Sequence, residues 1–343
     1  MKGCLLIALY SIRSERQFCE RLQYDLLFKW FLDLNVIAPA FDASTFSKNK
    51  KRLLEHDMTQ QFFQRVLEEA RPRKLLSWEH FTVDGTLLEG WVSMKSVQPK
   101  DRYGNGAGPM GKNPDVDFRR ERRLNATHAS TTDPEPQLAR NGLGKEAKLC
   151  FMGRVLMENR NGLVMEIAVT RATGTAEREA ALQMLYLVPG THHITVGADK
   201  SYGTKDLVRE CRDMDITPHV AQKQHSAIDA RTTRHYGYRI SQRIRKRVEE
   251  IFGWVKTVGG DRKLRYKGVA RNGMWATCTA TAYNLVRMAK LALVPAPASE
   301  SQTPVCLAGQ IGADQPLRRL PSRVKPPSRP RQSSHFTRPH AIN

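Results

Sequence analysis

The stretch "ITVGADKSYGTKDLV", residues 194–208, has the pattern of a buried strand followed by a turn and a helix. Its apolar run stops at Asp199, where a strand that continued into the core would carry another apolar side chain. A turn is one explanation, because aspartate is common in turns. The other is that Asp199 binds a metal ion together with carboxylates from distant parts of the chain.

The segments around this strand predict an α/β fold. A strand pattern in "FTVDGTLLEGW" includes Asp84, and two further strands flank Asn161-Gly162, a dipeptide typical of a β-hairpin. "ITPHVA" is a fifth strand, and long helices are expected near 240–258 and 274–293. A hairpin followed by strand–helix alternation predicts a ribonuclease-H-like mixed five-stranded sheet with flanking helices.

Three further regions complete the expected organisation. Residues 1–70 have helical spacing and predict an all-α, helix-turn-helix-like domain whose basic helix is capped by Ser44 and Thr45. A helical bundle with a solvated basic face explains the same pattern. The ribonuclease-H-like domain then covers 71–293 with a polar Gly/Pro-rich insertion at 92–145, and the Pro/Arg-rich tail at 294–343 is expected to be disordered.

The charge of the chain indicates a polyanionic partner. Its 343 residues carry 55 Lys and Arg against 34 Asp and Glu, a net charge of +21, which favours nucleic acid. No apolar run reaches the ~18 residues of a membrane span, so no membrane association is expected. Six scattered cysteines without a CxxC pair favour reduced thiols in the cytoplasm. Motifs for acyl transfer, zinc proteolysis and ATP hydrolysis are absent from the sequence.

Three carboxylates fall where the expected sheet can bring them together: Asp84, Asp199, and Glu249 or Glu250. Such a cluster needs cations to stay ionised, and oxygen ligands suit two Mg²⁺ or Mn²⁺ ions that act on a phosphodiester. Helical spacing puts Glu249 on one stripe with Arg245 and Lys256 and turns Glu250 toward solvent. Surface helices carry similar stripes as simple ion pairs, and that alternative stays open.

The motifs of the chain resemble those of bacterial insertion-sequence transposases of the DDE (Asp-Asp-Glu) class. They include "FTVDGTLLEGW", "KEAKLCFMGRVLMENRNGLV", "GADKSYGTKDLV" and "SQRIRKRVEEIFGWVKTVGG", and the likeness covers most of residues 9–293. By resemblance Asp84, Asp199 and Glu249 are the catalytic, metal-binding triad, and Arg245 and Lys256 match the basic part of the signature around the glutamate. Gln242 stands where many relatives have tyrosine. Relatives also begin several dozen residues earlier, which indicates a truncated N-terminus.

The resemblance implies a transposase that cuts and joins insertion-sequence ends by two-metal-ion hydrolysis and transesterification. Its partners would be double-stranded DNA (terminal inverted repeats and target) and a second copy in a homodimer. Residues expected to contact DNA are Arg245, Lys256, Lys200, Arg243, Lys246, Lys48, Lys50, Lys51, Arg52, Arg119 and Arg120. Two alternatives remain: a truncated or inactive derivative that only binds DNA, and a ribonuclease-H-like nuclease acting on RNA or junctions. His128 and Asp133 could approach DNA or the active site, although Asp133 before Pro134 also fits an ordinary helix start.

Overall fold

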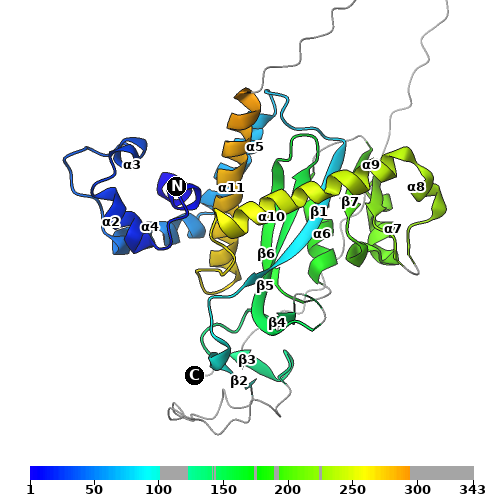
Figure 1. Cartoon of the computed structure of the whole chain (residues 1–343), viewed down its shortest axis with the longest axis horizontal. Coiled ribbons are helices and arrows are strands. Elements are labelled where there is room, and N and C mark those ends of the chain that lie inside the picture. Colours follow the sequence, from blue (N-terminus) through cyan, green and yellow to red (C-terminus); the bar gives the residue numbers. More distant parts are fainter. Residues whose placement is uncertain are drawn as a thin grey trace, which may run out of the picture. The chain divides into compact units, whose positions relative to one another are not determined.

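The computed structural model describes residues 1–100, 123–140, 142, 144–173, 176–188, 193–223 and 226–293. The chain divides into two units, Met1–Pro295 and Ala296–Asn343. The second unit, which holds most of the predicted tail 294–343, lies outside the described residues, as do residues 101–122, 141 and 143 of the predicted insertion. The account below concerns the first unit (Figure 1).

The central sheet has the strand order β4-β5-β1-β7-β8, with β6 beside β4 along the same edge of β5. Strands β4, β5 and β6 run antiparallel to their neighbours, whereas β1, β7 and β8 are parallel to one another. The strands are β1 His80–Glu89, β4 Gln137–Arg140, β5 Ala147–Glu158, β6 Val164–Arg171, β7 Ile194–Ala198 and β8 Ile216–Val220. The mixed α/β class is therefore confirmed.

Helices cover this sheet and form the N-terminal region. The first five are α1 Lys2–Leu9, α2 Glu15–Leu22, α3 Leu26–Phe31, α4 Ala43–Glu55 and α5 Met58–Ala70. The others are α6 Ala176–Tyr186, α7 Lys205–Asp213, α8 Ala230–Arg234, α9 Tyr236–Ile244, α10 Val248–Thr257 and α11 Val269–Leu293. Figure 1 shows α10 lying across the sheet, over β1 and β5.

Helix α11 joins two apolar cores because it is buried on more than one side. Ala276, Ala280 and Tyr283 belong to the core of the sheet. Trp275, Cys278 and Ala282, on another stripe, pack into the core of α1, α2 and α3. Spacings of three and four residues within each set keep each stripe on one side of the helix. The Ala- and Thr-rich sequence of α11 thus lets both cores approach it closely.

The structure differs from the predicted elements in several places. The sheet has six strands rather than five, because Gln137–Arg140 of the insertion pairs with β5 as β4. The insertion also contributes β2 Val97–Pro99 and β3 His128–Ser130, which form a separate two-stranded sheet. Asp42, not Ser44 or Thr45, caps α4, since its Oδ1 accepts the Thr45 amide at 2.8 Å. Aspartate is among the most favoured N-cap residues, and Asp42 directly precedes the helix.

The predicted long helix at 240–258 is interrupted. A 3-10 turn at Arg245–Arg247 separates α9 from α10. A tighter turn changes the direction of side chains that follow it. The side chains before and after residue 247 therefore do not lie on one ideal helical stripe, which bears directly on the positions of Arg245 and Glu249.

Candidate active site beside β1 and at the end of β7

Asp84 and Asp199 lie at the same level of two neighbouring parallel strands. The last paired positions are Val83 and Ala198, and each aspartate follows its partner directly. Parallel neighbours are about 4.8 Å apart and aligned residues face the same side of the sheet. Both aspartates are half-buried, and the Gly85 amide donates to Asp84 Oδ1 at 2.8 Å. The two carboxylates thus share one edge and one face.

A glycine lets the next helix approach the same face. A Cβ at Gly197 would lie 3.1 Å from Ser241 Oγ and 3.2 Å from Arg245 Cβ, closer than nearly all real contacts of that kind. Positions 197 and 199 are two residues apart on β7, so their outward directions agree. The end of α9 therefore packs directly beside Asp199.

Arg245 is the cation that this packing brings to the carboxylates. Its Nη2 lies 3.6 Å from Asp199 Oδ1. Its Nε donates to Gln242 Oε1 at 3.0 Å, and Gln242 Nε2 donates in turn to the His219 carbonyl of β8 at 2.5 Å. Gln242, the residue that departs from the family signature, therefore holds Arg245 in place and ties it to the sheet.

Lys256 fixes the other end of α10 over β1. Its Nζ donates to Thr86 Oγ1 at 2.5 Å, and Thr86 is two residues beyond Asp84 on the same face of the strand. Burial lowers the pKa of Lys256. Arg245 contacts the sheet beside Asp199, so the first turns of α10 lie between these two contacts.

Glu249 is in the first turn of α10 and is exposed. Among the residues that the structure describes, no group of three His, Cys, Asp or Glu side chains is placed to hold a metal ion. Asp84, Asp199 and Glu249 are all described, so their carboxylates do not form a closed three-ligand site here. The pair Asp84–Asp199 does fit a hard divalent cation by its donor atoms and position. Participation of Glu249 stays a prediction.

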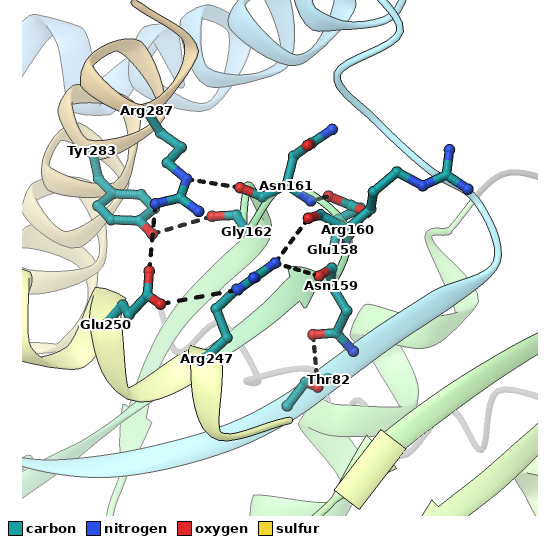
Figure 2. Close-up of polar contacts among 10 residues, drawn as sticks. All are labelled: Thr82, Glu158, Asn159, Arg160, Asn161, Gly162, Arg247, Glu250, Tyr283 and Arg287. Atoms are coloured by element: carbon teal, nitrogen blue, oxygen red, sulfur yellow. Dashed lines mark hydrogen bonds and ion pairs between the residues drawn. The ribbon is translucent and has the colours of Figure 1, made fainter. Parts of the chain in front are cut away.

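Glu250 belongs to a different set of contacts, on the side of the β5–β6 turn (Figure 2). Its carboxylate lies 3.9 Å from Arg247 Nε and 3.5 Å from Arg287 Nη1. Arg247 donates to two carbonyls of the turn at 159–162, Arg287 donates to a third, and Tyr283 Oη to the fourth. Glu250 is exposed as predicted, but it neutralises arginines that bind the hairpin. This contact set accounts for Glu250, and Glu249 stays the predicted partner of Asp84 and Asp199.

A layer of uncharged polar side chains lies next to the aspartates on the same face of the sheet. On β1 it includes Thr82 and His80, two and four residues before Asp84. His80 Nε2 is 2.8 Å from Ser241 Oγ, and Thr82 donates to Asn159 Oδ1 at 2.9 Å. Burial and the neighbouring His219 lower the pKa of His80 to about 4, so the imidazole is uncharged at neutral pH. Sequence reasoning missed this layer, since its members are isolated polar residues on four segments without a characteristic spacing.

Of the nine described residues predicted to contact DNA, six are exposed, Arg245 and Lys256 are half-buried, and one is buried. Lys200, Arg243, Lys246, Lys48, Lys51 and Arg52 reach solvent. Lys50 is buried, pairs with Glu15 and lies 3.8 Å from the centre of the Tyr266 ring. The prediction that Lys50 contacts DNA is corrected, because its ammonium group is paired with Glu15 inside the helical core. Arg119 and Arg120 lie outside the described residues.

A basic loop before α11 was not singled out in the sequence. Three of its side chains are exposed, Arg262, Lys263 and Lys267, and so is Arg271 in the first turn of α11. Lys267 Nζ lies 5.5 Å from the centre of the exposed Trp91 ring, and Arg13 and Lys263 line a cavity of about 440 Å³ next to that tryptophan. The signal was present as five basic residues without an acid between positions 262 and 271.

His128 and Asp133 have structural partners. His128 is buried in β3, with Nδ1 2.8 Å from Thr127 Oγ1. Asp133 precedes a bend rather than a helix, so the helix-start interpretation is wrong. Its carboxylate instead accepts the Gly268 amide at 2.8 Å, beside the bond from the Val269 amide to Glu135. These two acids satisfy free amides at the start of α11.

Comparisons with known proteins identify the class. A family model described as "Transposase DDE domain" matches residues 124–285, and one described as "Transposase domain (DUF772)" matches residues 1–52. Asp199 and the basic residues of α9 and α10 lie within the first match, whereas Asp84 lies outside both. The search of curated proteins found no match.

Two solved transposase structures have a low similarity to this chain. The "Crystal structure of the Mos1 Strand Transfer Complex" is 10% identical, over 82% of this chain and 76% of that one, with a TM-score of 0.21. The "Mos1 transposase paired-end complex with left transposon end" is 10% identical, over 76% of this chain and 77% of that one, with a TM-score of 0.22. With TM-scores this low, these two structures support no conclusion about the present chain.

The two family matches define the protein as a transposase. Within that class, the chain belongs to the transposases with a DDE domain. None of its described helices combines the length and apolar character needed to cross a membrane.

Proposed function

We propose that this chain cuts and joins the ends of an insertion sequence at the Asp84–Asp199 edge of a ribonuclease-H-like sheet. The observation that carries the proposal is the register of β1 and β7, which puts the two carboxylates side by side. The strand order, with an antiparallel β6-β5-β1 part and a parallel β1-β7-β8 part, supports that fold. The charge of +21 supports DNA as the substrate.

The residues around this edge have separate parts in the proposed reaction. Asp84 and Asp199 bind divalent cations, Mg²⁺ or Mn²⁺, with Glu249 as the third ligand. Bound cations neutralise the phosphate and activate the attacking oxygen. Arg245 and Lys256 hold the phosphodiester from either side, because Arg245 already contacts Asp199 at the end of β7 and Lys256 contacts Thr86 of β1.

The covalent steps follow from phosphodiester chemistry. Water attacks a phosphorus at the element's end, the bond to the 3′-oxygen breaks, and the 3′-hydroxyl is released. That hydroxyl then attacks a phosphorus of target DNA, and the bond to the target's own 3′-oxygen breaks. Arg245 exchanges its contact with Asp199 for one with the phosphate, since a guanidinium forms strong paired bonds with phosphate oxygens.

Cleavage of a duplex carrying the element's terminal repeats tests the proposal. The chain is expected to nick that duplex with Mg²⁺, and Asp199→Asn and Glu249→Gln are each expected to lower the rate at least about a hundredfold. Glu250→Gln is the matched control, because it makes the same change one residue away, in the set that contacts the β5–β6 turn. It should retain cleavage.

Two results would lead to other functions. Tight binding of terminal repeats without cleavage by the natural sequence would indicate a DNA-binding derivative of a transposase. Preferential cleavage of RNA–DNA hybrids would indicate a nuclease. Equal losses in Glu249→Gln and Glu250→Gln would reject the assignment of Glu249 as the ligand.

A further inference from the structure

An apolar surface on α3 and the loop after it has no part in the proposed catalysis. We call it the α3 patch, and its members are Tyr24, Leu26, Leu27, Trp30, Val36 and Ile37. Of the fourteen exposed large apolar side chains among the described residues, these six lie within fourteen positions. Trp30 is 72% exposed and Ile37 is 91% exposed. Concentrated exposure of this kind marks an interaction surface.

The α3 patch is held in a defined shape. On α3, residues 26, 27 and 30 fall within about 100° of arc at ~100° per residue, on the side opposite the fully buried Phe28. The buried Lys29 donates from Nζ to the Val36 and Ala38 carbonyls at 2.7 and 2.9 Å. Asn35 Oδ1 accepts the Ile37 amide at 3.0 Å, a short turn that presents Ile37 outward. The loop is therefore fixed beside α3.

The charge of this region differs from that of the whole chain. Residues 20–42 contain four acids, Glu20, Asp25, Asp33 and Asp42, and two bases, Arg21 and Lys29. Their sum is −2, and the remainder of the chain therefore carries +23. Two copies of so basic a protein repel each other wherever basic surfaces meet. Docking through the α3 patch brings two regions of net charge −2 together, which is a weaker repulsion than that between the basic remainders of +23.

We propose that the α3 patch is the surface through which a second copy of this chain docks. DNA is a poor occupant, because a local charge of −2 repels phosphates, and an anionic membrane is poor for the same reason. A symmetric pair places the same patch on both copies, and large side chains such as Trp30 are frequent anchors of interfaces. The need for a pair rests on the proposed function, since joining both ends of an element takes two sites and each chain has one Asp84–Asp199 pair.

Sedimentation equilibrium of the full chain, without DNA or metal, tests the docking surface. The dimer should strengthen as NaCl rises from low to moderate concentration, because salt screens the repulsion between basic chains. The double variant Trp30→Ala/Ile37→Ser keeps the charge and should weaken dimerisation at least about tenfold. Tyr186→Ala/Leu187→Ser, a similarly exposed apolar pair on another part of the chain, should have no effect. Circular dichroism should be unchanged in both variants.

Cross-linking identifies the occupant. An Ile37→Cys variant carrying a photoreactive label, in a mixture of ¹⁵N-labelled and unlabelled chains, should yield links between the 24–37 segments of different copies. Links to residues 296–343 of the same chain, a monomer at every concentration and salt, or an unweakened dimer in the double variant would each overturn the proposal. None of these readouts involves DNA cleavage, so failure of the proposed function and failure of this inference can be told apart.

Discussion

The carboxyl group of Asp261 should make the stability of the protein depend on pH in an unusual direction. Asp261 is 1% exposed and accepts hydrogen bonds from Trp275 Nε1 at 2.7 Å and from Thr279 Oγ1 at 3.3 Å. Burial is the largest effect and raises the pKa of Asp261 from 3.8 to about 7, against the opposing effects of both hydrogen bonds and of Arg265. The folded state therefore favours the protonated acid.

The sign and the size of the pH effect on the free energy of unfolding follow from proton linkage. Because the pKa is higher in the folded state, the contribution of Asp261 to stability is complete below about pH 4 and is lost as pH rises through about 7. A rise from 3.8 to about 7 corresponds to about 4 kcal/mol as an upper figure. Asp261→Asn keeps an oxygen for Trp275 and cannot ionise. The variant should lose none of this free energy on going to pH 8.

Urea denaturation between pH 4.5 and 8 measures the effect. The free energy of unfolding of the natural chain should fall relative to that of Asp261→Asn as pH rises. Asp42→Asn is the control: hydrogen bonds from Ser44 and Thr45 lower the pKa of the exposed Asp42 to about 2, so its contribution changes only in acid. Parallel pH profiles for the natural chain and Asp261→Asn would refute the reasoning.

Three further outcomes are expected. Gly197→Ala should destabilise the chain by about 1–3 kcal/mol in urea unfolding, because its Cβ would lie only 3.1 Å from Ser241 Oγ and 3.2 Å from Arg245 Cβ and α9 would have to shift. Gly253→Ala, where a Cβ meets nothing within 4 Å, should be neutral or stabilising. In DNA titrations at several salt concentrations, Lys256→Gln should weaken binding and lower the salt slope by about 1; an unchanged slope would remove Lys256 from the phosphate contacts. Gln242→Ala should lower the cleavage rate about tenfold with unchanged DNA affinity, since Arg245 loses its support, and a pure affinity loss would contradict that role.

Local patterns predicted the parts of the fold that depend on short segments. The Asn161-Gly162 turn is an example: Gly162 adopts φ +72°, the conformation that a hairpin turn favours in glycine. The helix Lys205–Asp213 was likewise visible, because its apolar residues recur at helical spacing. Asp84 within β1 and Asp199 at the end of β7 were found for the same reason, since each follows a strand pattern directly.

Features that depend on distant contacts were not predictable in this way. Lys50 looks like a surface lysine on α4, and only the fold brings Glu15 to it across 35 residues. Strand β4 has little apolar character and exists because the edge of β5 extends beyond β6 and offers free backbone groups. The break between α9 and α10 could not be predicted from proline or glycine, because the sequence there contains neither. Residue 245 also keeps ordinary helical backbone angles.

The four carbonyls at 159–162 give the β5–β6 turn a mechanical role. Turn carbonyls of this kind usually bind water, whereas here Arg247, Arg287 and Tyr283 donate to them. Arg247, which directly precedes α10, makes two of these bonds, and Glu250 of α10 pairs with Arg287 of α11. The helix that carries Glu249 is therefore joined by polar contacts to the β5–β6 hairpin and to α11, and α11 in turn packs against the N-terminal helices.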